Sequence, residues 1–252
     1  MKDFASFFVA FAVAAVAWRL WLLARHARHV ARHRDRVPAD FAALVPPEAH
    51  AKAADYTRDK VRVAAVETVL VDGALLLAMS VGGGLALVDG ASRAMLGDGY
   101  LGDLGTVFGF VAVGALAALP LAAWRTFVVE ARHGFNQTSP ATFAADLAKG
   151  VALAAALGTP LVLAVCWFID TAGAWWWVWA WGAWVAFTLL LVAIFPRWIA
   201  PLFNRFTPLE DGELRRRIEA LVARCGFRAE GLFVMDGSRR SSHGNAYFTG
   251  FG

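Results

Sequence analysis

The sequence has 252 residues, of which 59% are hydrophobic and 17% are charged, with a formal net charge of +4 at pH 7. Soluble globular proteins have about 45–50% apolar and about 25% charged residues, so this composition excludes an ordinary water-soluble domain. It also excludes a disordered chain, because disordered segments are poor in apolar residues. The two cysteines, Cys166 and Cys225, support neither a disulfide framework nor a cysteine-based zinc site. We therefore expect a membrane protein.

Five apolar stretches have the length of about 20 residues that a membrane-spanning helix needs. The first is expected to stay as an anchor, because its apolar core is too long for a cleavable signal and no small-residue cleavage site follows it. The expected spans are residues 4–24, 63–88, 104–128, 151–169 and 174–195.

Arginines and histidines cluster directly after the first span. His26, His29 and His33 recur at steps of three and four, so a helix would align them with the spacing of metal ligands. Five arginines surround them. A positive field opposes binding of a divalent cation and attracts anionic lipid, so we favour lipid contact over a metal site here.

Two acidic residues, Glu67 and Asp72, fall in or near the second span. Ionisable groups in a membrane are costly and mark candidate functional sites. Water in a hydrated chamber, an interhelical ion pair or a position near the interface would each account for Glu67. Gly82, Gly83 and Gly84 follow in the same apolar run without a phosphate-binding lysine, which predicts close helix packing or a kink.

Residues 133–140 predict the end of one helix and the start of the next. A helix dipole favours His133 in a last turn, and Gly134 supplies a left-handed stop. Ser139 and Pro140 then begin a new helix. We prefer a structural role for this loop.

Basic residues collect in alternate connections, after the first, third and fifth spans. Residues 89–103 hold a single arginine and residues 170–173 hold none. Because basic loops stay cytoplasmic, we expect the N-terminus outside and residues 197–252 in the cytoplasm. Tryptophans between positions 175 and 184 suit an aromatic belt at the outer end of the fifth span. The abundance of alanine and arginine indicates a GC-rich coding sequence, so a bacterial inner membrane is expected.

From residue 197 the composition becomes that of a soluble unit. Thr207, Pro208 and Glu210 form a capping-box pattern, which predicts a helix that starts at Thr207, and Gly226 is expected to end it. Residues 232–235 and 245–249 predict two short strands. One helix and two strands cannot form an independent core, so we expect the chain to be the N-terminal part of a longer protein.

Three segments resemble the type I CAAX prenyl endopeptidases. Residues 125–136, RTFVVEARHGFN, are similar to the family signature TFVIEEKHGFN. Residues 199–209, IAPLFNRFTPL, are similar to PLFNKFTPL, and residues 236–252, DGSRRSSHGNAYFTGFG, are similar to DGSKRSSHSNAYFYGFG. Residues 37–38 and 56–77 also fit the family, so the resemblance covers nearly the whole chain.

The resemblance implies an integral-membrane zinc metalloendopeptidase of the gluzincin type. The expected fold is mainly α: a chamber-like bundle of membrane helices in residues 1–196, then the start of a small cytoplasmic α+β protease domain in residues 197–252. In this family an HExxH helix supplies two zinc ligands and a general base, and a later glutamate supplies the third ligand. No HExxH occurs in residues 1–252. The resemblance thus implies zinc ligands downstream of Gly252, no catalytic or metal residue in this chain, and no activity for the chain alone.

The resemblance also implies a substrate-binding strand. In the family, the NAY segment pairs with the substrate backbone and its asparagine bonds a substrate peptide group, positions that are Asn245 and Ala246 here. His243 is a candidate for lining the same cleft, but a role in a turn or in supporting the neighbouring site residues is preferred for it. Without the resemblance, Asn245 would be interpreted as a turn residue or the start of a strand.

The expected partners are peptide or protein substrates, lipid-modified CAAX proteins among them, and membrane lipids. Nucleic-acid binding is not supported, because membrane topology already accounts for the arginines. Two alternatives stay open: a non-catalytic membrane protein, such as a scaffold or a transporter-like protein, and a membrane heat-shock quality-control protease. Quality control of membrane proteins is also an option for the role of the zinc endopeptidase, because a bacterium would lack prenylated proteins.

Overall fold

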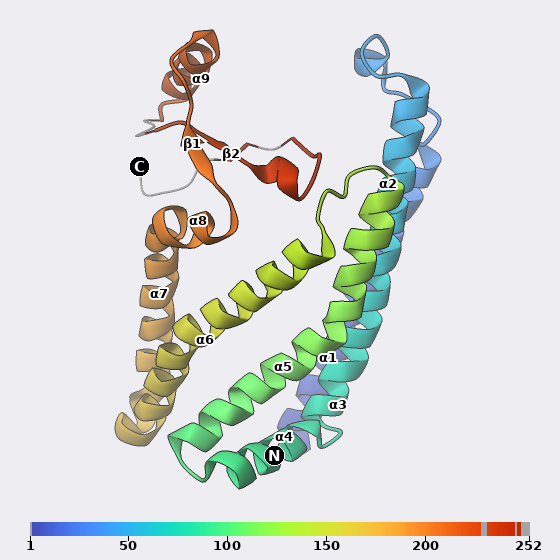
Figure 1. The fold of residues 1–252 in the computed structure, drawn as a ribbon. Helices are drawn as coiled ribbons and strands as arrows, with labels where there is room; N and C mark the ends of the chain where they lie inside the picture. Colours follow the sequence, from blue (N-terminus) through green and yellow to red (C-terminus); the bar gives the residue numbers. More distant parts are fainter. Residues whose placement is uncertain (1, 228–230, 245, 248–252) are drawn as a thin grey trace. The chain divides into compact units, whose positions relative to one another are not determined.

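The computed structural model describes residues 2–227, 231–244 and 246–247, which are mainly α-helical (Figure 1). The chain forms two compact units, residues 1–136 and 137–252. As expected, the described residues contain five helices long and apolar enough to cross a membrane: Phe4–Arg32, Pro47–Ser80, Tyr100–Glu130, Pro140–Thr171 and Gly173–Phe203.

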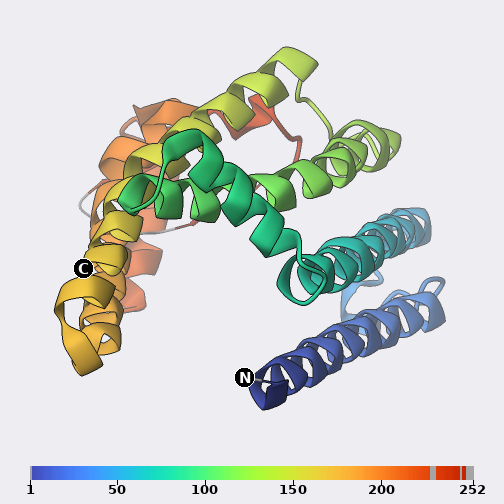
Figure 2. The same cartoon turned by 90° about the horizontal axis from the view of Figure 1, so that it is seen from below.

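In the first unit, α1 (Lys2–Arg32) lies beside a composite helix made of α2 (Pro47–Glu67), η2 (Thr68–Leu75) and α3 (Leu76–Ser80). Figure 2 shows α1 and this composite helix side by side. A short helical turn, η1 (Ala39–Phe41), lies in the connection between them. The less exposed face of α1 carries small or aliphatic residues at steps of three and four: Val9, Ala12, Val16, Leu20, Leu23, Ala27 and Val30. This spacing places them on one face of the helix.

The second helix corrects the expected span of residues 63–88. It ends at Ser80, and α4 (Gly84–Leu96) begins after a turn in which Gly83 has a φ angle of 84°. Glycine adopts such a left-handed conformation without the penalty that a Cβ imposes. The glycine run thus breaks the helix, in agreement with the predicted kink, whereas the apolar run from which the span was predicted continues across the break.

The polar segment after the second span is helical where a loop was expected. α4 packs against α5 (Tyr100–Trp124), which continues as η3 (Arg125–Glu130). Arg93 holds the two helices together, with nitrogen–oxygen distances of 3.0 Å to Asp89 and 2.8 Å to Asp103. Hydrogen bonds from Arg93 and Thr106 hold the pKa of Asp89 below its usual value.

Glu67 and Asp72, the two acidic residues expected in or near the second span, are each paired with an arginine from another helix. The Glu67 carboxylate lies 2.6 Å from the Arg125 guanidinium, and Asp72 accepts a hydrogen bond from Arg19. An uncompensated charge is costly in a bilayer, and pairing lowers that cost. The interhelical ion pair, one of the explanations offered by the sequence, therefore accounts for Glu67.

The second unit begins with α6 (Pro140–Thr171), whose start was predicted from Ser139 and Pro140. The Thr142 amide donates to Ser139 Oγ at 3.1 Å, so the serine caps the helix. The chain then forms η4 (Gly173–Trp175), α7 (Trp176–Ile194), η5 (Phe195–Ile199) and α8 (Ala200–Phe203). Large apolar side chains on α7 are exposed, as expected for a surface that contacts lipid: Trp177, Trp179, Trp181, Trp184, Leu189 and Leu190.

The predicted helix start at Thr207 is wrong. Residues Phe206–Pro208 form β1, which pairs antiparallel with β2 (Phe233–Met235), and α9 (Glu213–Arg224) starts after Gly212. The Leu209 amide donates to the Leu232 carbonyl at 2.8 Å, which extends the strand pairing through the expected first turn. Tertiary pairing has overridden a local helix signal.

Two other expectations for this region agree with the structure. Gly226 ends the α9 segment with a φ angle of 78°, and the predicted strand at residues 232–235 is β2, which η6 (Gly237–Arg239) follows. The second predicted strand, residues 245–249, lies largely outside the described residues.

Candidate peptide-binding segment

The expected substrate-binding residues belong to the segment 241–247, which follows η6. His243 is exposed, and its backbone amide donates to Ser241 Oγ at 3.2 Å. Ala246 is also exposed. Asn245 lies outside the described residues. The segment therefore presents His243 and Ala246 at the surface of the second unit.

Asp236 fixes the start of this segment against the chain that precedes β1. Its backbone amide donates to the Arg205 carbonyl at 3.1 Å, and its carboxylate accepts from the Arg205 amide at 2.7 Å. The hydrogen bond that the carboxylate accepts from the Arg205 amide, with a smaller contribution from Arg239, keeps the pKa of Asp236 below its usual value. Asp236, directly after β2, is thus bonded to Arg205, directly before β1.

Arg240 fixes the segment a second time, against α6. Its guanidinium donates to both Asp146 carboxylate oxygens, at 2.7 and 2.9 Å, and to Asn204 Oδ1 at 2.8 Å. The Arg240 and Asp146 side chains are 25% and 24% exposed. Two parallel hydrogen bonds between a guanidinium and a carboxylate define an orientation as well as an energy. The bonds to Asp146 also raise the pKa of Arg240 above its usual value.

The backbone of Arg240 is also fixed by hydrogen bonds. Its carbonyl oxygen accepts from the Gln137 amide at 3.1 Å and from Thr138 Oγ1 at 3.0 Å. Gln137 and Thr138 directly follow the HGFN motif in the sequence. Arg240 therefore connects two other parts of the chain to the segment that follows it. One is Gln137, directly after the HGFN motif, and the other is Asn204 in the FNRF motif of residues 203–206.

Sequence reasoning missed Arg240 and Asp146, which lie 94 positions apart. Arg240 lies in the basic region after the expected fifth span, and Asp146 falls just before the expected fourth span. One signal was available: Asp146 is the one acidic residue in the first turns of the apolar helix α6. A charge at that position predicts a partner from elsewhere in the chain.

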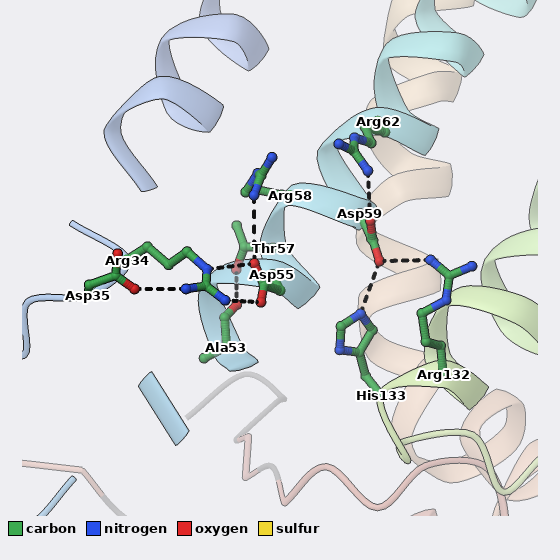
Figure 3. A network of polar contacts seen from close by, with 10 residues as sticks. All are labelled: Arg34, Asp35, Ala53, Asp55, Thr57, Arg58, Asp59, Arg62, Arg132 and His133. Atoms are coloured by element: carbon green, nitrogen blue, oxygen red, sulfur yellow. Dashed lines mark hydrogen bonds and ion pairs between the residues drawn. The ribbon is translucent and has the colours of Figure 1, made fainter. Parts of the chain in front are cut away.

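The HGFN motif of the first unit is also held by polar contacts. His133 Nε2 lies 3.1 Å from Asp59 Oδ2, and Arg132 donates to the same oxygen at 3.2 Å (Figure 3). Gly134 follows with a φ angle of 78°. His133 is 8% exposed, so its ring is part of the packing between α2 and the end of η3. This arrangement agrees with the structural role preferred from the sequence.

A tyrosine of α2 completes this packing. The Tyr56 hydroxyl donates to Glu130 Oε1 at 2.7 Å. Its ring contacts the rings of His133 and Phe135, with centroid distances of 5.1 and 4.9 Å. One residue earlier on α2, Asp55 accepts two hydrogen bonds from Arg34, which Figure 3 shows beside the His133 cluster. The part of α2 that begins at Asp55 therefore anchors both the end of η3 and the chain after α1.

The described residues contain no group of three or more histidine, cysteine, aspartate or glutamate side chains placed to hold a metal ion. The His29 and His33 rings lie with centroids 4.3 Å apart in a tilted arrangement, but His33 Nδ1 is hydrogen-bonded to the His29 carbonyl at 2.9 Å. The part of the chain that the structure describes thus does not fit a zinc site.

Comparisons with known proteins agree on one family. Residues 26–205 match a family described as CAAX prenyl protease N-terminal, five membrane helices. A CAAX prenyl protease 1 homologue of Arabidopsis thaliana is 35% identical over 85% of this chain and 52% of its own length. A probable CAAX prenyl protease 1 of Schizosaccharomyces pombe is 32% identical over 95% of this chain and 53% of its own length.

A solved structure gives the same result. The crystal structure of S. mikatae Ste24p matches with a TM-score of 0.83 and 29% sequence identity, over 98% of this chain and 58% of that chain. The chain spans about half the length of the curated relatives it matches. The matches favour neither the scaffold alternative nor the heat-shock protease alternative.

Proposed function

This chain belongs to the family of CAAX prenyl protease N-terminal domains with five membrane helices, and on that premise we propose that it is the membrane-embedded, substrate-receiving part of a zinc metalloendopeptidase. The full protein would hydrolyse peptide bonds of membrane-associated substrates, with lipid-modified CAAX-type proteins as one class. In this proposal residues 1–196 are the membrane domain, and residues 197–252 begin the protease domain.

The set of hydrogen bonds made by Arg240 is the observation that carries the proposal. Its contacts with Asp146, Asn204 and Gln137 fix the chain immediately before residues 241–247. A peptide-binding segment must be held in one conformation before the substrate arrives, because ordering it on binding would reduce affinity. The hydrogen bonds of Arg240 supply such an anchor at the start of the segment for which the family resemblance implies substrate binding.

Residues 241–247 would bind an extended peptide through backbone hydrogen bonds. This mode uses main-chain groups at a strand edge, and it tolerates many side chains. The carboxamide of Asn245 can donate to and accept from one substrate peptide group. Ala246 leaves room for the substrate backbone, and His243 lines the same edge.

Zinc is the cofactor of this proposal, and its ligands and general base would lie outside the 252 residues. No HExxH occurs in residues 1–252, and the relatives are about twice as long as the matched region. A catalytic zinc keeps one coordination position open for water and lowers the pKa of that water toward about 7. The 252-residue chain alone would then be inactive, and its own residues would hold and orient the peptide.

The chain is an integral, multi-pass membrane protein of five spans. We propose that the N-terminus is outside and residues 197–252 are cytoplasmic, in a bacterial inner membrane. The orientation is supported by the alternation of arginine-rich and arginine-poor connections. The use of arginine in place of lysine supports the bacterial source.

Cleavage by the full-length protein in lipid nanodiscs tests the proposal. We expect a farnesylated peptide or an unmodified membrane-associated peptide to be cut, cleavage to stop with a zinc chelator, and zinc to restore it. The 252-residue chain should bind the same peptide without cutting it. Cleavage that survives complete removal of metal, or the absence of cleavage of both peptides by zinc-loaded protein, would contradict the proposed function.

A further inference from the structure

The outer face of α1 carries a continuous stripe of bulky residues. Its members recur at steps of three, four or seven positions, which places them along one line of the helix: Phe4, Phe7, Phe11, Trp18, Trp21, Arg25, Arg28 and Arg32. We call this line the outer stripe. It lies opposite the face of α1 that packs on α2 and η2, and its members are exposed. Phe11 and Trp18 are 68% and 62% exposed.

The aromatic part of the stripe is about as long as the hydrocarbon core of a bilayer is thick, and the cationic part follows it. Phe4 and Trp21 are separated by about 26 Å at 1.5 Å per residue, close to the roughly 30 Å of a bilayer core. Arg25 lies about 6 Å further along the helix. Its guanidinium is 5.6 Å from the centroid of the Trp21 ring, and Trp21 stacks on Trp18 with centroids 4.9 Å apart.

The three arginines of the stripe have no carboxylate partner within the part of the chain that the structure describes. Arg28 donates to the backbone carbonyl of Ala24 at 3.2 Å. By contrast, the other helical arginines of this unit each form an ion pair with a carboxylate: Arg19, Arg58, Arg62, Arg93, Arg125 and Arg132. Charge that the protein leaves uncompensated on one helix face is available to an external anion.

From these observations we propose that the arginine end of the outer stripe, Arg25, Arg28 and Arg32, binds the phosphate headgroup of an anionic phospholipid. Guanidinium groups donate to phosphate oxygens in a bidentate geometry that a headgroup can accept. The acyl chains of the same lipid would lie along Trp21, Trp18 and the phenylalanines. The stripe thus matches both parts of one molecule, its charge and its hydrocarbon.

A second copy of the chain is a less suitable occupant of this face. Copies inserted in the same direction would bring identical arginines together, and juxtaposed like charges oppose association. A phospholipid brings the opposite charge to the same place. The inference does not depend on proteolytic activity.

Native mass spectrometry of the full protein from nanodiscs with equal phosphatidylglycerol and phosphatidylcholine tests the inference. Basic residues near a membrane surface contribute about fivefold each to binding of anionic lipid. We expect retained phosphatidylglycerol to exceed retained phosphatidylcholine, and the Arg25→Gln/Arg28→Gln/Arg32→Gln variant to lose at least about tenfold of that preference. The corresponding lysine variant should keep most of it, because the charge remains.

The matched control removes three exposed arginines from α9 instead, as Arg216→Gln/Arg217→Gln/Arg224→Gln. An equal loss of phosphatidylglycerol in this control, or no loss in the α1 variant, would overturn the inference. Unchanged melting temperatures in pure phosphatidylcholine show that the variants fold, and single Arg28→Gln substitution replaces the triple variant if that one unfolds. Competition by millimolar inorganic phosphate would indicate a site for a free anion, and dimers strengthened by the glutamine variant would indicate a second copy; either outcome overturns the lipid assignment.

Discussion

Arg240 and Asp146 are joined by two hydrogen bonds of 2.7 and 2.9 Å, although 94 positions separate them in the sequence. Both side chains are about three-quarters buried, and Arg240 also binds Asn204. This pair connects the apolar helix α6 to the segment that precedes the candidate peptide-binding residues. The chain directly before residue 241 is therefore held by a contact between two residues that are remote in the sequence.

Arg240→Ala should lower the stability of the second unit by about 2 kcal/mol, because it removes charge-assisted hydrogen bonds and leaves Asp146 without its partner. Asp146→Ala should have a similar effect, and the double variant should cost less than the sum. Thermal unfolding in nanodiscs measures all three. Arg224→Ala, an exposed arginine of α9, is the control and should change little. Additive effects of the two single changes would argue against a coupled pair.

Glu67 and Arg125 should likewise behave as a unit, since their 2.6 Å contact lies within membrane-length helices. Glu67→Leu alone leaves the Arg125 charge uncompensated, and Arg125→Leu does the same to Glu67. Each single change should destabilise the protein more than the double change to leucine. Unfolding of the three variants in the same lipid gives the comparison. A double variant that is less stable than both singles would contradict an isolated interhelical pair.

A substitution at Thr68 should not lower stability, in contrast to the changes above. Its hydroxyl oxygen is fully buried and has no hydrogen-bond partner among the described atoms. Thr68→Val keeps the shape and removes the unsatisfied group, so it should leave stability unchanged or raise it by about 1 kcal/mol. Thr106→Val is the matched control, because the Thr106 hydroxyl donates to Asp89 at 2.9 Å. The control should lose stability, and a comparable loss from Thr68→Val would show that its hydroxyl is bonded.

The lowered pKa of Asp236 predicts a pH dependence for the β1–β2 region. Because the folded pKa lies below the unfolded value of about 3.9, the carboxylate stabilises the fold fully above that pH. The contribution disappears as pH falls through the folded pKa. The difference in melting temperature between the wild type and Asp236→Asn should therefore be constant near pH 6 and shrink toward pH 3. A difference that grows on acidification would contradict the Arg205 amide as the cause.

Membrane helices were predictable because apolar length decides them, and five were found among the described residues. Their ends were not, since hydropathy continues across the break at Gly83, where backbone conformation ends the helix. The strand at Thr207 was missed for a related reason. Its local sequence favours a helix cap, and its partner, Val234, is 27 positions away.

The position of the candidate segment stays a prediction from the resemblance, whereas its supporting contacts could not be predicted at all. The resemblance predicts that residues 243, 245 and 246 contact the substrate, and the structure shows only that His243 and Ala246 are exposed. Nothing local indicates that Arg240 reaches Asp146, because an exposed ion-pairing arginine and a buried one have the same sequence signature. Long-range pairs of this kind follow from tertiary packing alone.

Photo-crosslinking at position 247 of the full-length protein tests most directly whether residues 241–247 receive a peptide. A photoreactive residue in place of Tyr247, which is 51% exposed, should crosslink an extended membrane-associated peptide. Unlabelled peptide should compete, whereas a proline-rich peptide, which lacks the amides for strand pairing, should not. The same probe at Leu221, an exposed position of α9, should give no competed product. Equal crosslinking at both positions, or none that peptide can displace at position 247, would contradict the account.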